Sequence, residues 1–428
     1  MSTTEAKLHP PARHTTEHWT RVRAEVARAI DEVPLYAGRP APPDGDSPEQ
    51  LSAWLAAMPT IGKRELRRGF PKALVRRSND LKAEMAAGRV EIISTSGTVE
   101  NRLQVLWEWT WWDPQEREAM RLNARVARTM AAEFREAVLT TPVCGGSTCH
   151  VGNLSRAERT IDGMLFLNQL ADPTHWTPGE LDRMVLEWND FRPAGVEADP
   201  AYLAALCRHV TASGGRLHSP AFVTLTYEQI TRAHRRQIAA VIESPLYSLY
   251  GATECGVLFM ECDAGRLHHN TRHSHIELLD AGGGMGRVLV TTLGRTWMPL
   301  VRYDVGDLVR LAPDDDVPCR CGREQGGYLL ERVEGRAADC IGSPDGKWIT
   351  PAALDDAVDA ADPTIAAWQL ALDGSAAAGS GTHTLRVVGS DGKAAAEALA
   401  ALLGARVQAS REMAIVPEGS GKYRLVRS

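Results

Sequence analysis

Short apolar runs alternate with helical stretches through the middle of the chain, and this alternation restricts the fold more than any other feature. Residues 221–226 and 246–250 have the composition of buried strands, and residues 227–242 between them carry a helical pattern. Alternation of this kind is typical of α/β proteins, in which helices cover a sheet. The pattern therefore predicts an α/β fold.

The composition is that of an ordinary water-soluble protein with room for a large core. The chain has 428 residues, 44% of them hydrophobic and 24% charged, which suits more than one domain. With 48 basic and 54 acidic residues the formal charge is −6, so neither nucleic acid nor an anionic membrane is expected as a partner. No apolar run is long enough to span a bilayer.

The N-terminal residues 1–11 are polar and lack the apolar stretch of a signal peptide, so the expected compartment is the cytoplasm. Eight cysteines in that compartment are expected to be reduced. Cysteines with a role are then metal ligands or site residues rather than disulfide partners.

Further elements follow from periodicity and from helix-start signals. Helices are expected at 17–32, 49–58, 63–68 and from 113 to about 138, and strands at 90–93 and 101–109. From residue 286 the chain turns β-rich, with strands at 287–292 and 308–311. These elements predict a large N-terminal domain of mixed sheets and helices.

A domain boundary is expected near Gly335 and Arg336. Beyond it, two helices are predicted at 351–361 and 393–403, and two strands at 366–372 and 384–388 with a Gly/Ser/Ala-rich loop between them. The sequence therefore predicts residues 1–335 as a large domain and residues 336–428 as a small α+β domain.

A loop rich in hydroxyls follows the strand at 90–93. It contains Ser94, Thr95, Ser96, Gly97 and Thr98. Hydroxyl and backbone N–H donors on a glycine turn can surround phosphate oxygens. The loop lacks the Gly-Lys-Ser/Thr ending of a Walker A motif, and on its own it is better explained as a polar turn between two strands.

Two further segments and a lysine near the end of the chain offer nucleotide chemistry. The run Tyr250-Gly251-Ala252-Thr253-Glu254 places an aromatic ring, a hydroxyl and a carboxylate at one strand end. Tyr250 is a candidate for stacking on a purine and Glu254 for holding Mg²⁺, which prefers oxygen ligands. Asp307 follows a glycine and could accept from ribose hydroxyls, and Lys422 follows Gly421.

Taken together and in this order, the motifs resemble the adenylate-forming superfamily, most closely its phenylacetate–CoA ligase branch. The resemblance runs from about Ile92 to Arg424 and includes a run from Cys319 to Arg323 that is typical of this branch. It implies a mobile C-terminal domain that turns about the segment from Gly335 to Asp339. It also implies that Lys422 acts on the α-phosphate of ATP during adenylation.

The resemblance assigns roles to individual residues. It implies catalytic roles for Lys422 and for Glu254, the latter as the magnesium ligand. It implies that ATP is bound by Ser94, Thr95, Ser96, Gly97, Thr98, Glu228, Tyr250, Gly251, Ala252, Thr253, Asp307 and Arg336. The chain departs from the family pattern at 99–102 after the phosphate loop, at Tyr227 in place of a glycine, and at Ala338 in the hinge.

A tetrahedral Zn²⁺ site is expected from two separated pairs of ligands, Cys262 with His268 and Cys319 with Cys321. Cys-x-Cys is less specific than a Cys-x-x-Cys knuckle, and four unmetallated side chains in turns are the alternative. His269, Cys255 and Cys340 are the substitutes for a misassigned ligand. Four protein ligands would make the site structural.

The glycine-rich run 144–152 matches the stretch that lines the acid pocket in this branch. Gly146, Cys149 and His150 are therefore candidate substrate contacts, with a tight turn as the alternative. Four tryptophans are clustered nearby in the sequence, and either an aromatic pocket or core packing could use them. They are Trp107, Trp109, Trp111 and Trp112.

The expected activity is ATP-dependent activation of an acid, an aromatic carboxylate in the first interpretation, as an acyl-AMP that is passed to the thiol of CoA. A second interpretation keeps the adenylation and changes the acceptor or the acid, to a carrier-protein thiol, an amine or nitrite in secondary metabolism. A third is a nucleotide-binding relative without turnover. The expected partners are a small-molecule acid, ATP, Mg²⁺ and CoA or another acceptor, and the resemblance implies a homodimer.

Overall fold

The computed structural model describes most of the chain. The described residues are 7–10, 12–45, 47–95, 103–132, 134–140, 152–170, 172–313, 318–323, 326–343, 347–373, 381–419 and 421–427. Some predicted site residues lie outside these ranges. They are Ser96, Gly97 and Thr98 of the phosphate loop and Gly146, Cys149 and His150 of the expected acid pocket.

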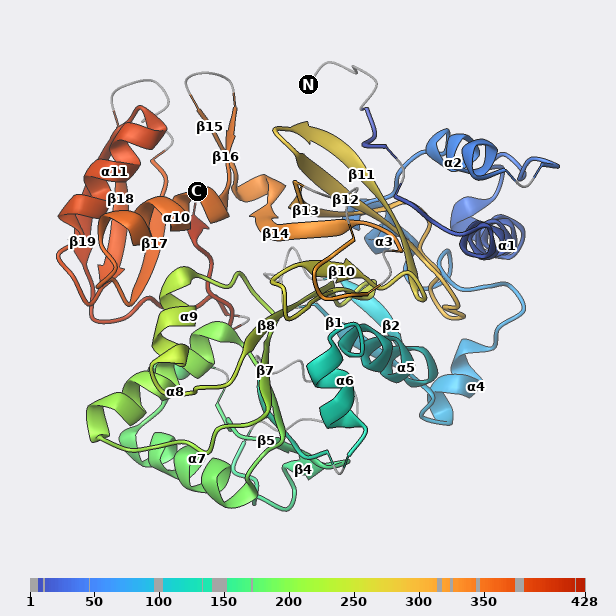
Figure 1. The fold of residues 1–428 in the computed structure, drawn as a ribbon. Coiled ribbons are helices and arrows are strands. Elements are labelled where there is room, and N and C mark those ends of the chain that lie inside the picture. The colour runs from blue at the N-terminus through green and yellow to red at the C-terminus, as the bar shows by residue number, and fades with distance from the viewer. Residues whose placement is uncertain are drawn as a thin grey trace. The chain divides into compact units, whose positions relative to one another are not determined.

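The chain forms two compact units, each assembled from segments that are distant in the sequence (Figure 1). The first unit comprises Met1–Ala127, Val143–Cys149 and Leu249–Val333. The second comprises Arg128–Pro142, His150–Ser248 and Glu334–Ser428. Strands β8 (Leu246–Ala252) and β14 (Leu329–Arg336) begin in one unit and end in the other.

The first unit combines N-terminal helices with mostly antiparallel strands. Its helices are α1 (Thr16–Glu32), η1 (Pro34–Tyr36), α2 (Pro48–Ala56), α3 (Lys63–Gly69), α4 (Leu81–Ala86), α5 (Trp109–Met120) and the start of α6 (Ala124–Met130). Its strands, besides parts of β8 and β14, are β1 (Val90–Ser94), β2 (Gln104–Glu108), β9 (Gly256–Glu261), β10 (Leu267–His269), β11 (Ser274–Gly282), β12 (Met285–Thr292) and β13 (Tyr303–Leu311).

Helix α1 shows why the N-terminal helices belong to the core of this unit. Thr15 caps the helix by accepting a hydrogen bond from the His18 N–H at 3.2 Å. Trp19, Val22 and Val26 recur at helical spacing, are buried, and pack in one cluster with residues of β11, β12 and β13. The strands themselves follow the order β11-β12-β13-β14-β10-β9-β8.

The second unit contains parallel strands, crossover helices and a C-terminal sheet. Its helices are η2 (Pro173–His175), α7 (Pro178–Phe191), α8 (Pro200–Ser213), α9 (Arg232–Ala239), η3 (Ala337–Asp339), α10 (Pro351–Ala361) and α11 (Lys393–Leu403). Its strands, besides parts of β8 and β14, are β3 (Glu136–Leu139), β4 (Thr160–Ile161), β5 (Met164–Phe166), β6 (Gly195–Ala198), β7 (Phe222–Leu225), β15 (Ile341–Gly342), β16 (Trp348–Ile349), β17 (Ala367–Ala371), β18 (Thr382–Val388), β19 (Arg406–Arg411) and β20 (Val426–Arg427).

The parallel part confirms the predicted α/β pattern. Strand β3 pairs in parallel with β5 and β6, β6 with β7, and β7 with β8. Helices α7, α8 and α9 cover these strands and share one buried cluster with them. The predicted helix at 227–242 is shorter in the structure, because Thr231 caps α9 by accepting from the His234 N–H at 3.1 Å.

The C-terminal segment has the predicted α+β character. Its sheet has the order β19-β18-β17-β20, and α10 and α11 bury their apolar faces against it. Both helices have the bounds expected from the sequence. The boundary at residues 335 and 336 stays a prediction, and this segment shares its compact unit with residues 150–248.

One predicted helix is wrong. The helix expected from 113 to about 138 is divided into α5 and α6, and Val138 lies in the buried strand β3. Asn123 ends the continuity because its Oδ1 accepts from the N–H groups of Arg125 and Val126 at 2.9 and 3.1 Å and so caps α6.

The expected strand at 101–109 is β2, and it ends before Trp109, where α5 begins. Of the clustered tryptophans, Trp111 and Trp112 are buried, and Trp107 stacks on Trp112 with ring centroids 3.7 Å apart. Trp109 is 39% exposed. Core packing is therefore the role that the structure gives to at least two of them, as the sequence suggested.

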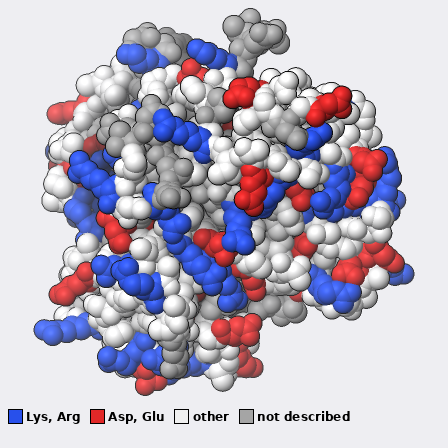
Figure 2. Space-filling view, turned by 45° about the vertical axis from the view of Figure 1, so that its right-hand side comes forward, with Lys and Arg blue, Asp and Glu red and all other residues white. Residues whose placement is uncertain are grey.

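Charges of both signs are interspersed on the face of the molecule shown in Figure 2. This mixture agrees with the small net charge of −6. Within the described residues, no helix combines the length and the apolar character that crossing a bilayer requires.

Candidate functional site

The Tyr-Gly-Ala-Thr-Glu run forms the tight connection between β8 and β9 in the first unit. The register of the two strands shifts between Tyr250 and Gly251. A Cβ atom on Gly251 would lie 2.4 Å from the carbonyl oxygen of Gly256, so only glycine fits this bulge. Tyr250 lies within β8, and Glu254 follows in the turn that leads into β9.

Tyr250 and Asp307 meet although they come from different strands. The Tyr250 hydroxyl donates to Asp307 Oδ2 at 2.9 Å. Asp307 lies inside β13, directly after Gly306. The strand bulges there because Gly306 adopts a φ of 89° and the pairing with β12 shifts in register. Two residues predicted to contact the nucleoside are thus brought together.

Glu254 is buried, and its carboxylate is held by partners that the sequence did not reveal. The Tyr303 hydroxyl donates to Glu254 Oε1 at 3.0 Å, and Lys63 Nζ lies 3.7 Å from the same oxygen. The buried Arg295 donates to the Glu254 backbone carbonyl and to that of Leu106. Burial and Glu254 raise the pKa of Tyr303 well above its usual value, which keeps the hydroxyl protonated as a donor.

Of the predicted phosphate loop, only Ser94 and Thr95 are described. Thr95 exchanges hydrogen bonds with Leu103: its N–H donates to the Leu103 carbonyl at 2.8 Å and its Oγ1 accepts from the Leu103 N–H at 3.0 Å. This pairing closes the β1–β2 hairpin at its loop end. Ser94 ends β1 and is exposed.

Lys422 lies in the second unit, in a turn closed by a hydrogen bond from the Glu418 N–H to the Lys422 carbonyl at 2.9 Å. Its Nζ donates to the backbone carbonyl of Tyr227 at 2.7 Å. The next residue, Tyr423, donates its N–H to Glu228 Oε2 at 2.7 Å. The structure therefore brings together the predicted lysine and the predicted ATP residue Glu228.

Position 227 carries tyrosine in this chain, where the family pattern has a glycine. It adopts a φ of 76°, in the left-handed region that favours glycine. Its hydroxyl donates to Oε1 of the half-buried Glu197, which anchors the strained residue. The carbonyl that receives Lys422 thus belongs to a residue fixed at both its backbone and its side chain.

Two buried acids lie beside the lysine loop. Each of Asp199 and Glu228 keeps a buried carboxyl oxygen that no N–H or O–H group of the described residues satisfies, and the two groups can hydrogen-bond each other only if one is protonated. Burial raises the pKa of Asp199 to about 7, and the charge of Lys422 opposes that rise. Burial and Asp199 raise the pKa of Glu228 well above its usual value.

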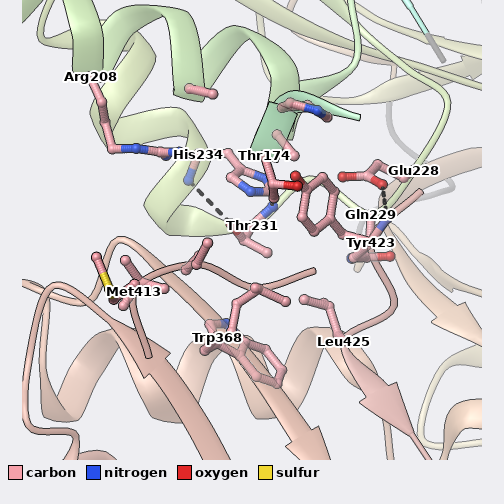
Figure 3. Close-up of a pocket in the computed structure, with 17 residues that line it drawn as sticks. Thr174, Arg208, Glu228, Gln229, Thr231, His234, Trp368, Met413, Tyr423 and Leu425 are labelled. Carbon is pink, nitrogen blue, oxygen red and sulfur yellow. Dashed lines mark hydrogen bonds between the residues drawn. The ribbon is translucent and has the colours of Figure 1, made fainter. Parts of the chain in front are cut away.

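A small cavity adjoins this loop (Figure 3). Its volume is about 160 Å³, and its wall includes Glu228, His234, Trp368, Met413 and Tyr423. Burial, followed by the charge of Arg208, lowers the pKa of His234 to about 3, so this imidazole is neutral. The cavity is smaller than pockets that enclose drug-sized ligands, so no substrate is assigned to it.

The predicted hinge begins at the end of β14, where the backbone at Gly335 departs from the extended conformation of a strand. Gly335 has a φ of 111°, and a Cβ atom there would lie 2.7 Å from Pro351 Cγ. Arg336 is exposed at the end of β14. Asp339 Oδ1 accepts from Arg424 Nε at 3.1 Å, so the last residue of the predicted hinge is bonded to the segment between Lys422 and β20.

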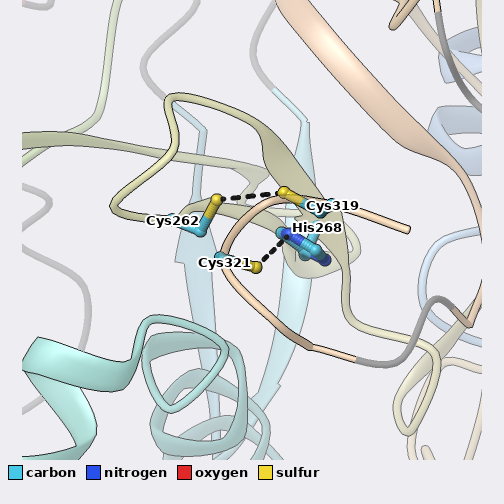
Figure 4. A group of neighbouring side chains, drawn as sticks. All are labelled: Cys262, His268, Cys319 and Cys321. Atoms are coloured by element: carbon cyan, nitrogen blue, oxygen red, sulfur yellow. Dashed lines mark hydrogen bonds between the residues drawn. The ribbon is translucent and has the colours of Figure 1, made fainter. Parts of the chain in front are cut away.

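The four predicted metal ligands converge in the first unit (Figure 4). One ligand atom each from Cys262, His268, Cys319 and Cys321 lies within 4.8 Å of the others. The β9–β10 hairpin supplies the first two, and the segment before β14 supplies the Cys-x-Cys pair. The substitute ligands named from the sequence, His269, Cys255 and Cys340, are not members of this group.

The spacing of these atoms fits a tetrahedral zinc ion. Ligands at Zn–S of about 2.3 Å lie about 3.8 Å apart, and a sulfur and an imidazole nitrogen lie about 3.6 Å apart. The Cys262 Sγ–Cys319 Sγ distance is 3.7 Å and the Cys321 Sγ–His268 Nε2 distance is 3.4 Å. Burial lowers the pKa of His268 to about 4, which leaves its imidazole neutral as a ligand requires.

No protein-family model matches the chain. Phenylacetate–coenzyme A ligase of Pseudomonas putida is 25% identical over 341 residues, which cover 75% of this chain and 70% of that protein. This chain is therefore similar in sequence to phenylacetate–coenzyme A ligase over three quarters of its length. A second protein of that name, from Thermus thermophilus, is 30% identical over 175 residues, but these cover only 36% of this chain and 38% of that one.

The fold of this chain also occurs among solved structures. A 2-hydroxyisobutyryl-CoA ligase in the postadenylation state superposes with a TM-score of 0.69 at 16% identity, over 97% of this chain and 90% of the other. At that identity the likeness establishes the fold alone. It confirms the expected architecture, a large α/β body with a small α+β region at the C-terminus.

Proposed function

We propose that the protein is an AMP-forming ligase that activates a carboxylic acid with ATP and transfers the acyl group to the thiol of CoA. The homology to phenylacetate–coenzyme A ligase over 75% of the chain carries this proposal. The meeting of Tyr250 with Asp307 supports it, because the two residues come from separate strands and have the types that a nucleoside site needs.

In the first half-reaction an oxygen of the acid attacks the α-phosphorus of ATP, and pyrophosphate leaves. Lys422 is the residue that would neutralise the charge developing between acid and phosphate, as a compact ammonium on a flexible stem. In this proposal Tyr250 stacks on the adenine and Asp307 accepts from the ribose hydroxyls.

Glu254 is the proposed magnesium ligand. Mg²⁺ would supply charge neutralisation on the phosphate oxygens, which is its usual part in phosphoryl transfer. Glu254 fits this part because it is a carboxylate with fixed orientation, held by Tyr303 and by Arg295 through its backbone. Lys63 lies near enough to compete for the same oxygen or to contact a phosphate oxygen beside it.

The second half-reaction requires Lys422 to leave and the thiol to enter. We propose that residues 336–428 turn about the segment from Gly335 to Asp339 to allow this. The lysine loop would then release the Tyr227 carbonyl and Glu228, which hold it by two hydrogen bonds of 2.7 Å.

We also propose that the Cys262 cluster holds a structural Zn²⁺, since four protein ligands leave no open position for substrate. The acid is proposed to be aromatic, by similarity to the two phenylacetate–coenzyme A ligases, and a homodimer is the proposed assembly. The alternative is transfer to a carrier-protein thiol or an amine, or activation of nitrite. Two departures from the family pattern favour testing it, since Tyr227 stands where the family has a glycine and Ala338 where it has an acidic residue.

The test is ATP–pyrophosphate exchange across a panel of aromatic and aliphatic acids and nitrite, followed by product analysis with CoA or an amine. Acid-dependent exchange and an acyl-CoA product are expected. An amide, or exchange that depends on nitrite, would establish the alternative. Absence of AMP formation across the whole panel would contradict adenylation and leave a nucleotide-binding protein without turnover.

A further inference from the structure

Residues 421–423 of the lysine loop are each hydrogen-bonded to the part of the second unit that carries α8 and α9. The Tyr202 hydroxyl, on α8, donates to the Gly421 carbonyl at 3.2 Å. Lys422 Nζ donates to the Tyr227 carbonyl at 2.7 Å, in the segment before α9. Two of the three bonds are thus made to neutral groups, and the third is made to an acid.

That third bond comes from Tyr423, whose N–H donates to Glu228 Oε2 at 2.7 Å (Figure 3). Beside Glu228 lies the fully buried Asp199, whose Oδ1 caps α8 by accepting from the N–H groups of Ala201 and Tyr202 at 3.0 and 3.4 Å. These bonds leave Asp199 Oδ2 and Glu228 Oε1 buried, with no donor among the described residues.

A proton held between the two acids would satisfy both of these oxygens. Two carboxylates side by side repel each other, whereas a carboxylic acid can donate to a neighbouring carboxylate. Burial raises the pKa of Asp199 to about 7. Burial and Asp199 together raise the pKa of Glu228 well above its usual value. The pair therefore keeps at least one proton near pH 7 while the loop is in place.

The groups around the pair leave this proton to the two acids. Burial raises the pKa of the Tyr202 and Tyr423 hydroxyls well above its usual value, so both stay neutral. The charge of Lys422 opposes protonation of both acids. Other titratable or charged groups act on these tyrosines, line the adjoining cavity or bind Tyr227, and they are Asp172, Arg208, His234 and Glu197.

We propose that Asp199 and Glu228 are positioning residues that hold the lysine loop through a shared proton, and that this proton leaves when the loop leaves. Departure of the loop removes the Tyr423 N–H from Glu228 and admits water to the pair. Carboxyl groups in water have pKa values of about 4, so the O–H bond breaks and the proton passes to water.

The sign of the pH dependence follows from the raised pKa values of the attached state. Attachment of the loop is fully favoured below the ordinary pKa of the acids, and this advantage is lost as the pH rises through about 7 at Asp199 and higher at Glu228. The consequence for catalysis rests on the proposed function, in which Lys422 withdraws before the thiol attacks. The second half-reaction should then gain on the first as the pH rises.

Amide hydrogen exchange of the substrate-free protein tests the proposal, because it reports brief openings of the loop. Exchange is catalysed by hydroxide, so its rate rises about tenfold per pH unit where opening itself is independent of pH, and about 100-fold or more where opening also releases a proton. Between pH 5.5 and 7 the steeper rise is expected at Tyr423. The Leu354 N–H, which donates to the Thr350 carbonyl at 3.0 Å in α10, should show the tenfold rise.

Two amide variants separate the shared proton from packing. In Asp199→Asn and in Glu228→Gln the new amide has nearly the same shape and donates to the remaining carboxylate, so no proton has to be held. The rise at Tyr423 should fall to about tenfold per pH unit in either variant. Asp391→Asn, at an exposed carboxylate of the same unit, is the matched control and should keep the steeper rise.

The proposal is overturned if exchange at Tyr423 rises only tenfold per pH unit in wild type, or if both amide variants keep the steeper rise. Equal exchange rates at Tyr423 and Leu354 would also overturn it, because the loop would then open only when the whole unit unfolds. None of these outcomes bears on adenylation, since the measurement contains neither ATP nor an acid substrate and ATP–pyrophosphate exchange is measured separately.

Discussion

Lys422 donates to a backbone carbonyl that belongs to a strained residue. Tyr227 offers that carbonyl from a left-handed conformation, and its hydroxyl is anchored on Glu197. The charge of Lys422 also acts on the buried acids Asp199 and Glu228. At the scale of single residues, the position of Lys422 therefore depends on a backbone carbonyl and on two neighbouring carboxyl groups.

Lys422→Ala should reduce ATP–pyrophosphate exchange by ~10²–10³-fold, because it removes a preorganised charge from the transition state. The variant should remain folded, since Lys422 is only partly buried. Lys393→Ala, at an exposed lysine of the same unit, is the matched control and should exchange at the wild-type rate. Equal rates for Lys422→Ala and wild type would refute the catalytic assignment.

The acid pair predicts how stability depends on pH. The pKa of Asp199 is raised from 3.8 to about 7 in the folded protein, so its contribution to stability is fully present below about pH 4 and is lost as the pH rises through 7. The charge of Lys422 lowers the pKa of Asp199. Lys422→Ala should therefore raise this pKa, so the loss of stability should continue to a higher pH. Urea unfolding of both proteins between pH 5 and 8.5 measures the difference.

Glu228→Gln provides a second test of the acid pair in the same urea unfolding measurement. The amide preserves the acceptor for the Tyr423 N–H and can donate to Asp199, which would allow Asp199 to ionise in the folded state. The slope of stability against pH should then flatten across this range. If the slope of stability against pH is unchanged in Glu228→Gln, Asp199 and Glu228 do not share a proton in the folded protein.

At the scale of elements, Gly251 controls the hairpin that carries Glu254. Gly251→Ala would place a Cβ atom 2.4 Å from the Gly256 carbonyl oxygen and should cost about 1–3 kcal/mol by overpacking. Gly342→Ala, in a strand with nothing within 4 Å of the new atom, should change stability by no more than about 0.5 kcal/mol. Equal unfolding midpoints for the two variants would contradict the argument.

Local signals decided which elements the sequence could predict. Helices α10 and α11 were predicted to the residue because Thr350-Pro351 opens one and Gly404 closes the other. The break between α5 and α6 was missed because Asn123 was not recognised as a cap, and it is fixed by a tertiary bond from its Nδ2 to the Glu261 carbonyl at 3.0 Å. A distant partner of this kind leaves no local signal.

The same distinction applies to the site. The motifs around Tyr250, Glu254 and Lys422 were visible because they are short runs, and the ligands of the cysteine cluster because of their chemistry. Lys63 and Arg295 could not be predicted, since only the tertiary fold brings them to Glu254. The acid pair at Glu228 was hidden for the same reason, because Asp199 has the sequence appearance of a helix cap alone.

At the scale of the whole molecule, the candidate residues are divided between the two compact units. Tyr250, Glu254 and Asp307 belong to the first, and Lys422 with Glu228 belongs to the second. A substitution that destabilises one unit should therefore first affect the candidate residues that lie in that unit. The cysteine cluster, which lies wholly in the first unit, offers a way to separate the two parts.

Removal of the metal proposed at the cysteine cluster should loosen the first unit selectively. An ion present at 1,000 times its Kd stabilises the folded state by about 4 kcal/mol, so Cys321→Ser or chelation should forfeit a stabilisation of that order. Amide hydrogen exchange should then accelerate in β9 and β10, which the cluster joins to the Cys-x-Cys segment, and stay unchanged in α10 and α11. Cys340→Ala, outside the cluster, should alter neither region. Faster exchange in α10 and α11, or no change in β10, would show that the ion does not stabilise the first unit in this way.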